Sequence, residues 1–318
     1  MLNKNNLLFI IKLFVSAALL FYIYISIPWG NVSEVIQSAS LDLLILSIFF
    51  QIFSYLFLAY RWGIIVRNSD FFINIFEIIK ISYIGTAFNN ILPGSIGGDF
   101  VRGAYIVKKG MSLKDSILSL IVDRIFGLFS TLVFITIFLF IYSNNHAFLS
   151  DINLLIMIFM AVLFFLIVVV KMSSFHKRIS WFLYKILSSN YYEKIVPFIK
   201  SLYSYSINNF LVIKVFTITV AATILEILVF WLASKSLGMD YSFYIFIIAV
   251  PLTILISTLP ISLGGLLVRE ASGLFLLNML GVGILHASSI IILYIPILII
   301  SSIPGVYFYL RSSKKLVN

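Results

Sequence analysis

Long apolar runs dominate the chain, and short polar segments separate them. The uninterrupted runs lie near residues 9–28, 41–60, 113–142, 152–170, 211–234 and 284–310. About 20 apolar residues are enough for a helix to cross the hydrocarbon core of a bilayer, whereas a barrel strand alternates apolar and polar residues over about ten positions. The pattern therefore predicts an all-α fold, a polytopic helical membrane protein.

Two further apolar runs, near residues 71–92 and 243–277, are interrupted by helix-breaking residues. The breaks contain Pro93, Gly97 and Gly98 in the first run, and Pro260, Gly264 and Gly265 in the second. Proline removes a backbone donor, and glycine lets two backbones or a ligand approach closely. We expect each run to form a re-entrant or broken helix, although two tightly joined full spans would give the same pattern.

The composition agrees with a membrane protein and excludes several kinds of site. Hydrophobic residues make up 62% of the 318 residues and charged residues only 11%, against about a quarter charged in soluble domains. The chain has no cysteine and only three histidines, far apart in the sequence, so we expect no disulfide, no metal site and no cofactor. The net charge of +10 is typical of cytoplasmic loops facing anionic lipid, and we expect no nucleic-acid partner.

The placement of Lys and Arg predicts the orientation of the chain. Basic residues cluster at 61–80, 102–114, 171–200 and 311–315, whereas the loops at 30–40, 143–151 and 236–243 have none. The positive-inside rule puts the basic clusters and both termini in the cytoplasm, which predicts a multi-pass protein of the cytoplasmic (inner) membrane. The first interrupted run then enters from the cytoplasm and the second from outside.

The segment 171–210 is basic, with interleaved aromatic residues. This pattern predicts amphipathic helices lying on the inner leaflet. A solvated cytoplasmic linker is the alternative.

An internal repeat relates the two breaks. Residues 92–105 and 259–272 share eight of fourteen residues at a constant offset of 167. Shifting the 41–60 and 113–142 spans by the same offset places them on later predicted spans. Shifting the first span by this offset places it on the basic segment instead. We expect one membrane domain, 1–318, with inverted repeats at about 1–143 and 152–318. Paired breaks in two halves of a transporter point to its binding site; the alternative is that small residues only let helices pack.

Charged residues within apolar runs are costly, and they mark candidate functional positions. The planar fork of arginine donates two hydrogen bonds to a phosphate, so three arginines could surround one phosphate, with carboxylates holding them or exchanging protons. The arginines are Arg102, Arg124 and Arg269, and the carboxylates Asp99, Asp123 and Glu270. An internal salt bridge is the alternative for each. Neighbours on a helix point about 100° apart, so we expect Asp123 and Arg124 to find partners elsewhere, such as Arg102 or Glu270.

Three other polar residues complete the candidate site. Asn89 and Asn90 directly precede the first break, where they could cap the broken helix or face a cavity. Glu226 lies within the 211–234 span without a cationic neighbour in sequence, so it is either protonated and hydrogen-bonded or a proton-coupling group. We consider Asp99, Asp123, Glu226 and Glu270 as candidates for proton coupling.

Three motifs together resemble a known family. They are Asn89-Asn-Ile-Leu-Pro-Gly-Ser-Ile-Gly-Gly-Asp99 with Arg102, Val122-Asp-Arg-Ile-Phe-Gly127, and Leu259-Pro-Ile-Ser-Leu-Gly-Gly265 with Arg269-Glu270. In this order they resemble the membrane region of lysylphosphatidylglycerol synthases, a flippase-like family. In the full synthases an aminoacyl-transferase domain follows this region. The chain ends at Asn318 without one, so the resemblance implies lipid translocation rather than synthesis, with a phospholipid or a polyprenyl-phosphate-linked lipid as substrate.

The sequence thus predicts a flippase for a phosphate-bearing lipid, with an anionic lipid and the bilayer as its partners. We find no set of catalytic residues typical of soluble enzymes. Two alternatives stay open: a membrane-embedded transferase using a lipid or polyprenyl-phosphate donor, and a partner subunit of a lipid-modifying enzyme.

Overall fold

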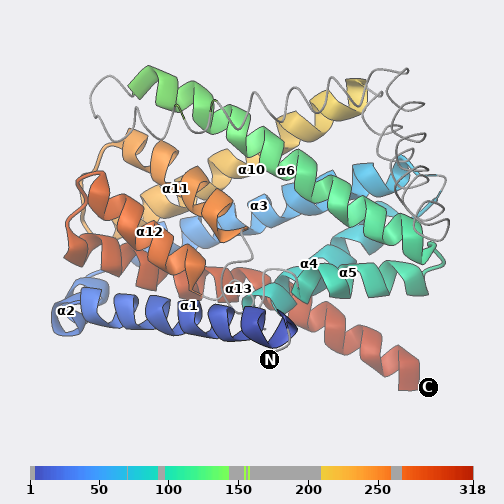
Figure 1. Cartoon of the computed structure of the whole chain (residues 1–318), viewed down its shortest axis with the longest axis horizontal. Coiled ribbons are helices and arrows are strands. Elements are labelled where there is room, and N and C mark those ends of the chain that lie inside the picture. The colour runs from blue at the N-terminus through green and yellow to red at the C-terminus, as the bar shows by residue number, and fades with distance from the viewer. Residues whose placement is uncertain are drawn as a thin grey trace. The chain divides into compact units, whose positions relative to one another are not determined.

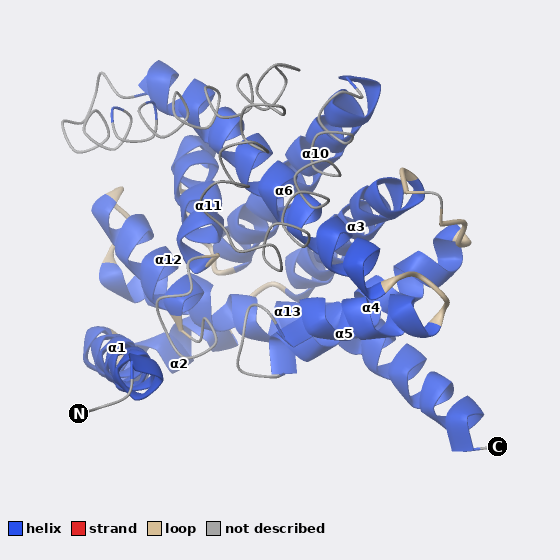
Figure 2. Ribbon diagram, turned by 45° about the vertical axis from the view of Figure 1, so that its right-hand side comes forward, coloured by secondary structure: helices blue, strands red, loops and turns tan. Residues whose placement is uncertain are grey.

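In a computed structural model of the chain, residues 4–69, 71–91, 97–142, 154, 157, 209–258 and 267–317 are described. Their regular structure consists of helices, as Figure 2 shows. The helices are α1 (Lys4–Ser26), α2 (Trp29–Gln37), α3 (Leu41–Arg67), α4 (Ile75–Ile91), α5 (Gly97–Lys108), α6 (Leu113–Tyr142), α10 (Asn209–Ser236), α11 (Phe243–Ser257), α12 (Val268–Met279) and α13 (Ile284–Val317). The all-α fold predicted from the apolar runs is confirmed.

Four of these helices are long and apolar enough to cross a membrane. They are α3, α6, α10 and α13, with 27 to 29 residues in the qualifying part of each. Helices α1 and α2 pass the same test together, but they meet at an angle of 70°. The bend falls at Pro28, which lacks a backbone donor and restricts the residue before it. The expectation of a loop at 30–40 was therefore wrong for residues 30–37, which belong to α2.

The helices that flank the two breaks are shorter than a span. Helices α5 and α12 have 12 residues each, about 18 Å at 1.5 Å per residue, against a hydrocarbon core about 30 Å thick. This length fits the prediction of broken or re-entrant helices. The breaks themselves lie outside the described residues, as do Pro93, Pro260, Gly264, Gly265, nearly all of the predicted 152–170 span and residues 171–208 of the basic segment.

The chain divides into two compact units. Unit 1 contains Met1–Tyr60, Asn74–Ile106 and Ala221–Asn318, and unit 2 contains Arg61–Ile73 and Val107–Val220. Both helix pairs that flank the breaks thus belong to unit 1. Neither unit follows the predicted repeat boundary, and the inverted repeat remains a prediction.

Within unit 1, α13 packs along α4 and also contacts α12, while α11 packs on α12. Figure 1 shows α11 and α12 side by side in orange. Gly305 on α13 lies directly against the backbone carbonyl of Tyr83 on α4, where a Cβ atom would have no room. The Tyr83 hydroxyl in turn donates a hydrogen bond to the Ile52 carbonyl of α3, 2.9 Å away. These contacts bring α3, α4 and α13 together.

Within unit 2, apolar residues of α3, α6 and α10 form one buried cluster. Its fully or almost fully buried members are Ile65, Leu118, Val122, Leu211 and Val215. The indole nitrogen of Trp62 donates to Ser119 Oγ at 3.3 Å beside it. Apolar packing and this hydrogen bond hold the three helix segments together.

Candidate functional site

Helices α4 and α5 form a tight antiparallel hairpin around the first break. The backbone nitrogen of Gly98 donates to Asn89 Oδ1 at 2.7 Å. A Cβ atom at Gly85 would meet the Gly98 carbonyl oxygen at 2.8 Å and Arg102 Cγ at 2.6 Å. Because later residues of α5 meet earlier residues of α4, α5 returns along α4, and Asn89 caps its first turn as the cap alternative predicts.

The first turns of α5 carry a buried ion pair. Asp99 lies in the first turn, and Arg102 Nη2 donates to its Oδ1. The Arg102 and Asp99 side chains are only 14% and 9% exposed. A larger residue at position 85 would displace the Arg102 side chain. Glycine at this position therefore leaves room for the arginine.

The second break leads into a similar arrangement. Leu267, which precedes α12, has φ 64°, a left-handed conformation that is uncommon for a residue with a side chain. Arg269 and Glu270 follow in the first turn, with Arg269 Nη2 and Nε at 2.9 and 3.2 Å from Glu270 Oε1. Side-chain exposure is 33% for Arg269 and 16% for Glu270. Helices α5 and α12, which follow the two breaks, therefore each carry near their start an arginine bound to a carboxylate.

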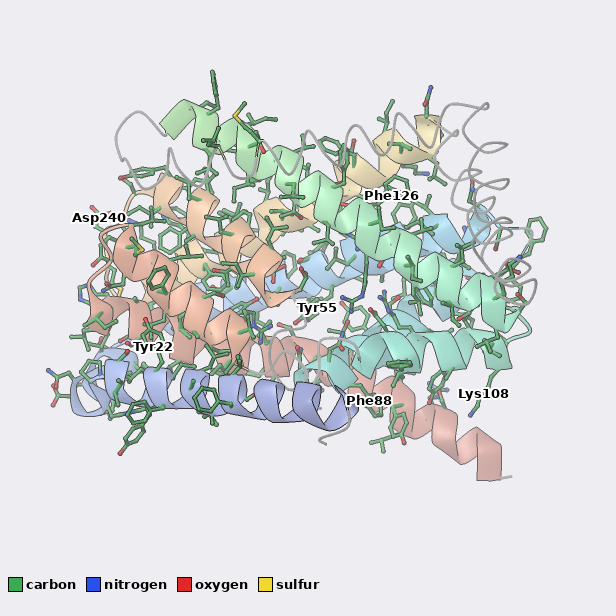
Figure 3. The ribbon with its side chains drawn as sticks, in the orientation of Figure 1. Tyr22, Tyr55, Phe88, Lys108, Phe126 and Asp240 are labelled. Atoms are coloured by element: carbon green, nitrogen blue, oxygen red, sulfur yellow. The ribbon has the colours of Figure 1, made fainter. Side chains whose placement is uncertain are left out.

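Polar side chains of α3, α4 and α13 connect these hairpins within unit 1. Asn90 Nδ2 donates to the Tyr55 hydroxyl at 3.2 Å and to the Leu298 carbonyl at 3.3 Å. Tyr55, labelled in Figure 3, lies within electrostatic range of Arg269. The Arg269 guanidinium lies over the ring of Tyr294, 5.4 Å from its centroid. Asn89 thus binds the start of α5, while Asn90 points toward α3 and α13.

Glu226 accepts hydrogen bonds from two other helices. The Tyr294 hydroxyl donates to Glu226 Oε1 at 2.8 Å, and Ser54 Oγ donates to Oε2 at 3.4 Å. Both interpretations of this residue, a protonated carboxyl and a proton-coupling group, remain predictions. Four residues of this region, Gln51, Ser54, Tyr55 and Tyr294, were not among the predicted site residues. The first three recur at i, i+3 and i+4 along an apolar helix, a polar stripe that could have identified them.

Asp123 has a different partner from those we expected. Arg61 Nε donates to Asp123 Oδ1 at 2.8 Å, and Arg61 Nη1 donates to Thr219 Oγ1 at 3.2 Å. The Arg61 and Asp123 side chains are 10% and 4% exposed. The second span is longer than predicted, since α3 continues to Arg67, so Arg61 belongs to this helix and is buried inside unit 2; its location on the cytoplasmic side remains a prediction. The pair joins α3, α6 and α10.

Arg124 follows Asp123 on α6 and is partly buried. It belongs to unit 2, whereas Arg102 and Arg269 belong to unit 1. A site containing all three arginines remains a prediction. In the part of the chain that the structure describes, no group of three or more His, Cys, Asp or Glu side chains could hold a metal ion.

The four long apolar helices define a multi-pass helical membrane protein, and two short helices with partly or largely buried ion pairs follow its breaks. The family described as the lysylphosphatidylglycerol synthase TM region matches residues 9–305. The chain belongs to this family, as the three motifs indicate, and it is a membrane protein of lipid metabolism or transport. The comparison with curated proteins finds no match for the chain.

Proposed function

We propose that the protein is a flippase that moves a phosphate-bearing lipid, a phospholipid or a polyprenyl-phosphate-linked lipid, across the cytoplasmic membrane. The observation that carries the proposal is the pair of helices α5 and α12 in unit 1, each of which carries near its start an arginine–carboxylate pair, largely buried in α5 and partly buried in α12. Family membership supports a role with lipids.

The chemistry of the two helix starts suits a phosphate group. Arginine remains charged and can donate two parallel hydrogen bonds to phosphate oxygens. The first turn of a helix adds unsatisfied backbone N–H groups and a partial positive charge. Asp99 and Glu270 hold Arg102 and Arg269 in place before binding, and a phosphate would replace part of these contacts. The headgroup binds here while the acyl chains stay in the bilayer.

Translocation would follow from the inverted repeat. If the two hairpins enter from opposite faces, rocking of one repeat against the other exposes the headgroup site to each side in turn. The distribution of Lys and Arg supports a cytoplasmic location for both termini.

Reconstituted vesicles test the proposal. Phosphatidylglycerol with a fluorophore on a short acyl chain is incorporated in both leaflets, and dithionite bleaches the outer leaflet. We expect wild type to expose the inner pool to bleaching, and Arg102→Ala and Arg269→Ala to fall to the rate of empty vesicles. Arg269→Lys, which keeps the charge but not the fork, should be intermediate.

Arg311→Ala is the matched control, because Arg311 is an exposed arginine near the end of α13. It should keep the wild-type rate. Full activity of both Arg102→Ala and Arg269→Ala would reject the site. Mass spectrometry of the vesicle lipids separates the transferase alternative, because a new covalent lipid species would favour an enzyme.

A further inference from the structure

Glu226 lies in a polar cluster that does not form part of the two arginine–carboxylate pairs. This Glu226 cluster consists of Gln51, Ser54, Tyr55, Glu226 and Tyr294, from α3, α10 and α13 of unit 1. Glu226 is ten residues from the end of the 28-residue helix α10, which is long enough to span a membrane. A carboxyl group at such a depth is costly and is usually functional.

The side-chain amide of Gln51 is a hydrogen-bonding group of this cluster that is not fully satisfied. It is fully buried, and neither its amide nitrogen nor its amide oxygen makes a hydrogen bond of ordinary geometry among the described residues, although the Glu226 carboxyl is close enough for a weak one from the amide nitrogen. The amide lies beside the Glu226 carboxyl. Buried amides are almost always hydrogen-bonded, so an unpartnered one needs an explanation.

A proton on Glu226 supplies what the amide lacks. A carboxylate can only accept hydrogen bonds, whereas a protonated carboxyl also donates one. The Gln51 oxygen can accept this bond, and its nitrogen can donate back to the other carboxyl oxygen. The Tyr294 hydroxyl already donates to Glu226, and the one Ser54 hydroxyl hydrogen is shared between Glu226 Oε2 and the Ala222 carbonyl, so neither side chain needs to move.

The titratable and charged groups near Glu226 are Tyr55 on α3, Tyr294 on α13 and Arg269 on α12, whose guanidinium binds Glu270. Tyrosine and arginine ordinarily release protons only near pH 10 and above pH 12. Glu226 and Glu270 are the carboxyl groups of this set. Glu270 is bound by Arg269, whereas Glu226 accepts a hydrogen bond from the Tyr294 hydroxyl.

The ring of Tyr294 lies between Glu226 and the proposed phosphate site. Its hydroxyl binds Glu226, and its face lies under the Arg269 guanidinium, 5.4 Å from the ring centroid. A phosphate bound to Arg269 would offset that positive charge and add a negative one near Glu226. Across roughly 10 Å, at an effective dielectric constant of about 20, such a change alters a proton affinity by about tenfold.

We infer that Glu226 takes up a proton when an anionic lipid headgroup binds at Arg269, so that the two ligands bind cooperatively. The inference rests on the proposed function, because it assumes that Arg269 binds the headgroup. Linkage is reciprocal, so protonation of Glu226 must tighten lipid binding by the same factor. The lipid should therefore bind more tightly as the pH falls through the titration range of Glu226.

Calorimetry on the purified full chain in a non-ionic detergent tests this directly. The probe is a short-chain phosphatidylglycerol, whose phosphodiester does not itself titrate near neutral pH. Titrations in two buffers with different ionisation enthalpies give the number of protons taken up per lipid bound. We expect a net uptake by wild type, up to one proton, and affinity about tenfold higher at low pH.

Three variants locate the proton. Glu226→Gln, which resembles the protonated acid, should bind the lipid with no proton uptake and no pH dependence. Gln51→Leu should reduce the uptake, because the protonated carboxyl loses its acceptor. Glu34→Gln is the control, since Glu34 is an exposed carboxylate on α2, and it should behave as wild type.

The outcomes separate the two proposals. If wild type binds the lipid without taking up protons, or if Glu226→Gln keeps the uptake, the inference is overturned while the flippase proposal stands. An uptake lost in Glu270→Gln but kept in Glu226→Gln would place the proton on Glu270 instead. If wild type and Arg269→Ala bind the lipid equally, the proposed headgroup site fails, and the inference fails with it.

Discussion

The side chain of Asn89, at the end of α4, accepts a hydrogen bond from the backbone nitrogen of Gly98, at the start of α5; the two atoms are 2.7 Å apart. The bond closes the hairpin across a break whose residues carry one of the three family motifs. It satisfies a backbone donor that the first turn of a helix leaves without a partner. Several consequences of this and other contacts can be measured.

Replacing Asn89 should destabilise the hairpin. Asn89→Ala removes the acceptor of the Gly98 N–H, and we expect the free energy of unfolding to fall by about 0.5–2 kcal/mol, as for other lost helix caps. Asn89→Asp keeps an acceptor oxygen and should restore most of the loss. Thermal unfolding in detergent measures both, and equal stability of Asn89→Ala and wild type would contradict the role of the cap.

Glycine is required at position 98 for packing. A Cβ atom there would collide with the Gly85 backbone oxygen and come within 2.6 Å of Asn89 Cγ. Because a backbone oxygen cannot rotate away, we expect Gly98→Ala to cost about 1–3 kcal/mol through overpacking. Gly30→Ala is the matched control: Gly30 lies in helix α2 with nothing within 4 Å of its Cβ position. It should be neutral or stabilising, since alanine favours a helix.

The Arg61–Asp123 pair should matter for folding. Removing one partner leaves the other charge buried, so Asp123→Ala should lower the stability by about 3–5 kcal/mol. The double variant Arg61→Met/Asp123→Leu leaves no buried charge and should be less damaging than Asp123→Ala alone. Denaturation in mixed micelles gives the comparison. A double variant whose loss equals the sum of both single losses would show that the two side chains do not interact.

Asp240 offers a pH-dependent measurement outside the spans. It is exposed in the turn between α10 and α11, where Lys235 donates a hydrogen bond to its carboxylate, and Figure 3 labels it there. This hydrogen bond and the positive charge of Lys235 lower the pKa of Asp240. The folded pKa lies below the unfolded one, so the pair stabilises the protein above the unfolded pKa, about 3.9, and the contribution is lost as the pH falls through the folded pKa.

Lys235→Ala should therefore raise the pKa of Asp240 toward its ordinary value. Carboxyl carbon shifts in NMR spectra of the labelled protein follow this titration. The effect on stability should be small, because exposed ion pairs contribute little. An unchanged Asp240 titration in the variant would show that Lys235 does not bind it in the membrane-embedded protein.

The sequence by itself determined the class of protein and most helices. Helix α6 has the predicted bounds, α10 is longer than predicted by two residues at each end, and α13 begins where predicted and ends seven residues later, because an apolar run of span length has no stable alternative to a helix in a bilayer. The motifs around Arg102 and Arg269 identified the family, since glycine, proline and arginine at fixed spacing are visible without coordinates.

Only the tertiary structure decided which polar side chains meet. Arg61 and Asp123 are 62 residues apart, and Glu226 and Tyr294 are 68 apart, so no local spacing pairs them. The rule that assigns basic residues to cytoplasmic loops counts charge along the chain, so it could not indicate that Arg61 binds a carboxylate on another helix. Helix packing determines such partners, because it fixes which helix faces are in contact, and periodicity describes only one helix at a time.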